Sequence, residues 1–75
     1  MKYYVIRTSL ITGRLDYLLN PRTKAGRIEW CSKAFKDQNP DKVHQFTKQG
    51  AKAICDRATD TWSWIYEAIP VTAFN

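Results

Sequence analysis

The segment that follows Thr47 has the clearest helical periodicity in the sequence, and it limits the folds open to the rest of the chain. Four small or apolar side chains stand at positions i, i+3, i+4 and i+7 and form one narrow stripe: Ala51, Ile54, Cys55 and Ala58. Thr47 is a suitable N-cap because its hydroxyl can accept from the free N–H groups of the first turn. The helix is expected to end near Ala58. One amphipathic helix can cover only one face of a sheet.

The other regular segments of the chain predict β-strands. Residues 2–8 and 15–19 are rich in β-branched and aromatic side chains, and Gly13 between them suits a turn because glycine tolerates a positive φ. Residues 27–32 alternate well enough to form a third strand, and residues 61–69 form a fourth. The sequence therefore predicts an α+β fold of one small domain, residues 1–75, with the order β-β-β-α-β. We expect a mostly antiparallel four-stranded sheet with one helix packed on one face; the strand order does not follow from the sequence.

The connection between the third strand and the helix has weaker signals. Residues 33–36 can extend the strand or open a short turn, and residues 37–41 have the composition of a turn. From Asp41 onward we expect a single helical turn or an irregular crossing that buries Val43 and Phe46.

In the last predicted strand, aromatic residues alternate with polar and aliphatic ones. Trp62, Trp64 and Tyr66 share one face, and the small side chains of the helix stripe permit close approach, so we expect these rings to pack inward. The alternative is that they lie on the open face as a binding platform. We expect a core centred on Val5, Ala51, Ile54, Ala58 and Trp64, with either Leu18 or Ile28 as a further member.

The net charge of +5 lies entirely in the first part of the chain. Residues 1–28 carry six lysines or arginines and one aspartate, whereas residues 29–75 carry six basic and six acidic side chains. Such an asymmetry favours an anionic partner, either a nucleic-acid backbone or an acidic protein surface. A solvated, solubilising face is the alternative.

Several functional classes lack their sequence signals. No apolar run approaches the roughly 18 residues of a membrane span, and no signal-peptide h-region follows the first residues, so a soluble, cytoplasmic protein is expected. Cys31 and Cys55 match no zinc or redox spacing and are expected to stay reduced. His44 is the only histidine, and there is no Gly-rich phosphate loop or paired-carboxylate site. The sequence thus predicts no enzyme activity, no catalytic or metal site and no cofactor.

A basic and aromatic surface is the candidate binding site. Interface centres are enriched in Trp, Tyr and Arg, and the same residue types can stack on bases and neutralise phosphates. The candidate residues are Arg7, Arg14, Tyr17, Arg22, Lys24, Arg27 and Trp30. Two hypotheses follow: a protein that binds another macromolecular complex, or direct binding of single- or double-stranded nucleic acid. No known nucleic-acid-binding motif is present.

The opening residues 2–7 (KYYVIR), residues 43–54 (VHQFTKQGAKAI) and the closing strand resemble the small β-sheet-plus-helix proteins common among bacteriophage early genes. The organisation is also similar to that of some small anti-CRISPR proteins. The resemblance implies a phage-encoded, non-enzymatic protein that inhibits or modulates a host protein or nucleoprotein complex in the host cytoplasm, such as a nucleic-acid-processing or CRISPR defence assembly. It carries over no functional residue.

Overall fold

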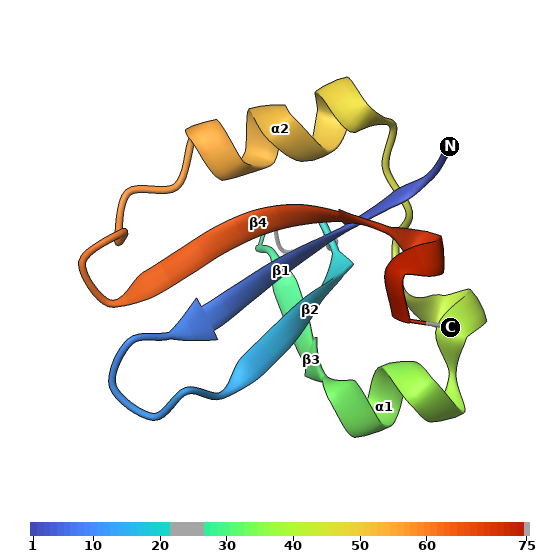
Figure 1. The fold of residues 1–75 in the computed structure, drawn as a ribbon, viewed down its shortest axis with the longest axis horizontal. Helices are drawn as coiled ribbons and strands as arrows, with labels where there is room; N and C mark the ends of the chain where they lie inside the picture. Colours follow the sequence, from blue (N-terminus) through green and yellow to red (C-terminus); the bar gives the residue numbers. More distant parts are fainter. Residues whose placement is uncertain (22–26, 75) are drawn as a thin grey trace.

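The computed structural model describes residues 1–21 and 27–74 and contains one four-stranded sheet (Figure 1). The strands are β1 (Tyr3–Ser9), β2 (Leu15–Asn20), β3 (Glu29–Ser32) and β4 (Trp64–Pro70). The helical segments are α1 (Lys33–Gln38), η1 (Pro40–Lys42), α2 (Lys48–Asp56) and η2 (Val71–Phe74), where η marks a 3-10 helix. The strand order is β3-β2-β1-β4 and every neighbouring pair is antiparallel. The predicted fold class, with its β-β-β-α-β order, is confirmed.

The β1–β2 turn and the start of α2 follow the predicted local chemistry. Gly13 has a φ of +74°, the left-handed conformation that glycine adopts without penalty. The Ser9 hydroxyl accepts from the N–H groups of Ile11 and Thr12 at 3.2 and 3.1 Å, which fixes the turn. At α2, the Thr47 hydroxyl accepts from the N–H of Gly50 at 3.1 Å, as expected of an N-cap. These contacts fix the conformation of the β1–β2 turn and of the first turn of α2.

Helix α2 packs on one face of β1 and β4, which we name the α2 face. Its buried core consists of Val5, Leu18, Phe46 and Ala51, with Ile54 and Ala68 partly buried against them. Phe46 also forms a β-bridge with Tyr3, so the crossing that leads into α2 is fastened to the sheet. The predicted burial of Val43 and Phe46 is confirmed.

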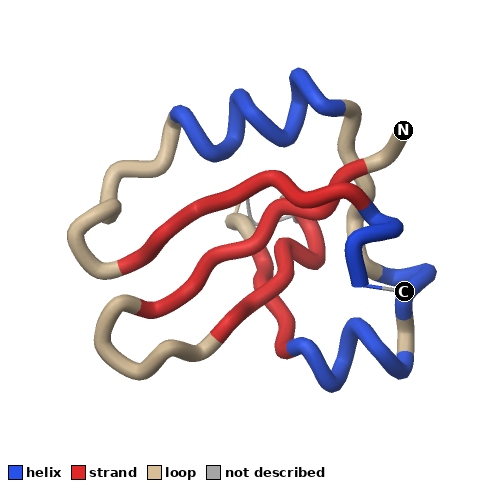
Figure 2. Tube along the Cα trace, viewed as in Figure 1, coloured by secondary structure: helices blue, strands red, loops and turns tan. Residues whose placement is uncertain are grey.

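The opposite face of the sheet is covered as well, contrary to the expectation of a single covered face (Figure 2). We name it the α1 face. Tyr4, Ile6, Tyr17 and Val43 form a second core there, with the rings of the two tyrosines edge to face at 5.5 Å. The ammonium of Lys36 in α1 lies 5.3 Å from the Tyr17 ring centroid, and this lysine is itself buried. Two small cores, one on each face, replace the one-sided packing expected of a sheet with a single helix.

The structure corrects the expectations for Trp62 and Ala58 and settles the choice between Leu18 and Ile28. Trp62 precedes β4 and is 80% exposed, so only Trp64 and Tyr66 lie half-buried on the α2 face. Of the two possible core partners, Leu18 is the buried one, because Ile28 precedes β3 and is exposed. Helix α2 ends at Asp56, which leaves Ala58 half-buried beyond its end.

None of the helices in the described part of the chain has the length and apolar character that crossing a bilayer requires.

Candidate functional site

A cluster of charged and aromatic side chains occupies the part of the α2 face beyond the helix. We name Arg7, Arg14, Asp16, Trp30 and Trp64 the arginine cluster. The Arg7 guanidinium lies between two indole rings, 4.3 Å from the Trp30 centroid and 4.0 Å from the Trp64 centroid. Antiparallel pairing explains the assembly, because Arg7 in β1 stands next to Asp16 in β2, which pairs in turn with Ser32 in β3. The cluster takes the place of a covering helix there.

Asp16 holds the two arginines of the cluster together. It is buried, and its carboxylate accepts from Nε of Arg7 at 3.2 Å and from Nε of Arg14 at 3.1 Å. The Arg7 side chain is only 19% exposed, whereas that of Arg14 is 69% exposed. Arg7 is therefore a desolvated cation with a carboxylate partner and two aromatic faces, an arrangement that favours a structural role.

Tyr66 extends this cluster toward the turn before β4. Its ring meets Trp30 edge to face at 5.9 Å, and its hydroxyl donates to Oδ1 of Asp60 at 2.5 Å. Burial is the larger cause and the hydrogen bond to Asp60 the smaller cause of a raised pKa for the Tyr66 phenol. The phenol is therefore a protonated donor at neutral pH. The turn is thereby tied to the sheet beneath it.

The candidate residues from the sequence do not all meet. Arg7, Arg14 and Trp30 line one hollow of about 400 Å³ together with Asp16, Cys31 and Ser32. Arg27 is exposed just before β3. Arg22 and Lys24 lie outside the described residues. The expectation that Tyr17 belongs to a binding surface is corrected by the structure. Tyr17 is fully buried in the second core on the α1 face, so its ring cannot serve a surface site.

Four residues with exposed apolar side chains belong to two turns that meet at one end of the sheet, or to the strand beside them (Figure 1). The N–H of Leu10 in the β1–β2 turn donates to the carbonyl of Ser63 at 2.9 Å, which joins that turn to the one before β4. We name the following four residues the hairpin-end patch, with their exposed fractions: Leu10 53%, Ile11 82%, Trp62 80% and Ile65 46%. The alternation of residues 61–69 predicts a covered Trp62; its place in a turn, two residues before β4 begins, explains its exposure.

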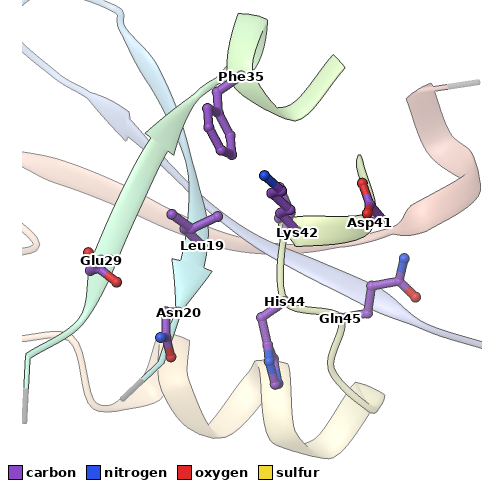
Figure 3. Close-up of a pocket in the computed structure, with 9 residues that line it drawn as sticks. Leu19, Asn20, Glu29, Phe35, Asp41, Lys42, His44 and Gln45 are labelled. Atoms are coloured by element: carbon purple, nitrogen blue, oxygen red, sulfur yellow. The ribbon is translucent and has the colours of Figure 1, made fainter. Parts of the chain in front are cut away.

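A second hollow, of about 720 Å³, opens between β2, α1 and the crossing at residues 41–45 (Figure 3). Figure 3 shows the Phe35 ring pointing into it from α1, above Leu19 of β2. Asp41 and Lys42 bring opposite charges to its rim, and the His44 ring packs on Phe46 at 4.4 Å. Within residues 1–21 and 27–74, no group of three or more His, Cys, Asp or Glu side chains gathers that can hold a metal ion.

The two cysteines are free, half-buried thiols packed against opposite cores. Burial raises the pKa of both thiols, and the carboxylates of Asp16 beside Cys31 and of Asp56 beside Cys55 raise it further. A raised pKa lowers the thiolate fraction, so both should react with a disulfide reagent more slowly than glutathione does at mildly alkaline pH. Absorbance of the released thiol measures this rate. In guanidinium chloride the difference should vanish, whereas a native rate equal to that of glutathione would contradict the assignment.

Comparisons of this chain with protein-family models, with curated protein sequences and with solved structures found no match.

Proposed function

We propose that this chain is a non-enzymatic binding protein that engages a protein partner through the hairpin-end patch. One observation carries the proposal: four large apolar side chains stay exposed at one end of a sheet whose two faces are otherwise packed. Single exposed apolar residues are ordinary on protein surfaces. A grouped set that includes a tryptophan is typical of an interaction site.

The neighbouring charges favour a protein over a nucleic acid as the partner. A nucleic-acid surface needs cations free to meet phosphates beside rings free to stack on bases. Arg7 is instead enclosed by two indole rings, and Asp16 neutralises part of the charge of Arg7 and Arg14. The exposed side chain of Arg14 suits the polar rim of a protein interface.

The resemblance to small phage proteins extends this proposal to the kind of partner. On that resemblance, the partner is a host protein or nucleoprotein complex in the cytoplasm of a bacterial cell. The chain would inhibit or modulate that complex by occupying part of its surface, without chemistry of its own. The alternative function is direct binding of nucleic acid, which the capture experiment described next distinguishes from binding of a protein partner.

The proposal predicts capture of a stoichiometric bacterial protein from lysate that persists after nuclease treatment. With that partner purified, Trp62→Ala is expected to raise Kd roughly 30-fold, because an interface hot spot contributes about 2 kcal/mol or more. Ile11→Ser should also weaken binding, since it puts a polar group at the most exposed position of the patch. Calorimetry or surface plasmon resonance measures both effects.

The matched control is Ile28→Ser, the same substitution at an exposed isoleucine outside the patch. It should leave Kd unchanged. Retention of only nuclease-sensitive material, with an affinity that falls steeply as salt rises, would reject the protein partner and support nucleic-acid binding. Equal effects of Ile11→Ser and Ile28→Ser would reject the patch as the contact surface.

A further inference from the structure

We propose that the outer edge of β4, together with the groove between β4 and α2, binds an extended acidic segment of a partner protein as a fifth strand. This site is separate from the hairpin-end patch and does not depend on it. The occupant is a peptide segment with acidic side chains at alternate positions. Three properties of the described residues carry the proposal: free backbone groups on an edge, a groove beside them, and lysines without ion-pair partners above the groove.

The direction of the β4 backbone groups follows from the hydrogen bonds of β1. Tyr3 and Phe46 exchange both backbone hydrogen bonds, each 2.8 Å long, so Tyr3 directs its N–H and C=O away from β4. Tyr3 pairs with Pro70, and residues of an antiparallel strand alternate in the side to which their backbone groups point. Pro70, Ala68 and Tyr66 therefore direct theirs away from β1. The bond from Leu10 N–H to Ser63 fits the same alternation at the other end.

The usable edge is limited at both ends of the strand. The N–H of Trp64 donates to the carbonyl of Asp60 at 3.2 Å, and Pro70 has no N–H. Between them, Tyr66 and Ala68 offer two N–H and two C=O groups, and no backbone hydrogen bond within the described part of the chain uses them. Edge strands normally carry several protective devices; here the charged Glu67 and the terminal Pro70 are present, and no bulge interrupts the β1–β4 register. Such an edge can accept another strand.

A groove of about 240 Å³ runs beside this edge on the α2 face. Its lining combines apolar and aromatic side chains with three charged ones: Tyr3, Lys48, Lys52, Cys55, Tyr66, Glu67 and Ala68. Side chains of a strand alternate between faces, so every second residue of an added strand would point into this groove. The side chains that enter it would be those of residues opposite Tyr66 and Ala68, because paired residues share a face.

The charges above the groove select an acidic occupant. Lys48 and Lys52 are exposed, and neither forms an ion pair with any residue that the structure describes. They stand at i and i+4, where like charges weaken a helix, and Lys48 lies in the first turn, where the helix dipole disfavours a cation. Both unfavourable placements fall on the side of α2 that lines the groove. Local rules broken at one spot without compensation point to a functional requirement there.

The probe that tests this is the capped peptide Thr-Glu-Thr-Glu-Thr-Glu-Thr, titrated into the isotopically labelled protein. We expect the amide resonances of Tyr66 and Ala68 to shift and their hydrogen exchange to slow. We expect the peptide to add antiparallel, as every neighbouring pair of strands in the sheet does, so that residues opposite Tyr66 and Ala68 direct their N–H groups to β4. N-methylation of the three glutamates should then abolish binding, whereas N-methylation of the inner threonines should not. The charge-reversed peptide with lysine at the three positions should not bind.

The double substitution Lys48→Glu with Lys52→Glu should weaken binding of the acidic peptide about tenfold, as expected when two exposed charge pairs become repulsive. The matched control is Lys42→Glu, an exposed lysine away from the groove, which should leave the affinity unchanged. Three results would overturn the proposal: no shift at Tyr66 and Ala68 with millimolar peptide, equal binding of the lysine peptide, or a dimer that protects these two amides without peptide. Loss of peptide binding in the Trp62→Ala variant would also overturn it, since the two sites are independent.

Discussion

Leu18→Ala is expected to lower the free energy of unfolding by about 2–5 kcal/mol, the range for a leucine truncated in a packed core. Leu18 of β2 is fully buried in the core that it forms with Val5, Phe46 and Ala51. Truncation therefore leaves a cavity that the surrounding side chains do not fill. A chain of 75 residues has a total stability of roughly 4–11 kcal/mol. The substitution therefore removes a large share of the stability. Urea unfolding followed by tryptophan fluorescence measures the change.

Leu10→Ala is the matched control for this prediction. It is the same chemical change at a leucine that is 53% exposed, and a surface substitution of this kind stays within about 0.5 kcal/mol. An equal loss of stability in the two variants would contradict the assignment of the core. Because Leu10 belongs to the hairpin-end patch, the same variant also separates stability from binding: it should fold normally and bind the partner more weakly.

Much of the fold could be predicted because local chemistry and global arrangement agree. The Thr47 cap, the apolar stripe of α2 and the glycine of the β1–β2 turn each rest on a local requirement that the structure meets. The strand pattern predicts Val5 in the core and the helical stripe predicts Ala51 there, and both are buried. These elements would be recognised in any chain with the same spacing.

The second core was missed because helix α1 is too short for a periodic signal. Six residues cover less than two turns, so its signs are local: Ser32 caps the N-terminus by accepting from Phe35 N–H, and Lys33 pairs with Asp37 at i+4. A second sign was the unbroken apolar run of residues 3–6. A strand buried on one face alternates, whereas this run is typical of a strand covered on both.

The binding residues were only partly predictable because charge in the sequence is not charge on the surface. Arg7 and Arg14 count as two cations, yet Asp16 neutralises part of that charge and the indole rings enclose Arg7. Tyrosine is a residue type that is common in interfaces, but Tyr17 is fully buried on the α1 face of β2. Strand order decides which of these side chains meet, and it does not follow from the sequence.

Asp16→Ala is expected to destabilise the protein by about 3–5 kcal/mol, the range for removing one partner of a buried ion pair. The substitution leaves the desolvated Arg7 between Trp30 and Trp64 with its carboxylate partner gone. Arg14 adds little to this cost, because its side chain is 69% exposed and water replaces the lost contact. Denaturant unfolding of the variant measures the effect.

Two further variants show whether the uncompensated charge is the cause. Arg14→Ala should cost less than about 1 kcal/mol, as for an exposed ion pair. Arg7→Met keeps an unbranched stem between the two indoles and removes the charge, so the double variant Arg7→Met with Asp16→Ala should be more stable than the sum of the two single effects implies. Strict additivity, or a cost of Asp16→Ala below that of Arg14→Ala, would show that the carboxylate does not hold the arginine cluster together. The cluster would then lose its role as the cover of the α2 face, and its hollow of about 400 Å³ would have to be considered as a ligand site.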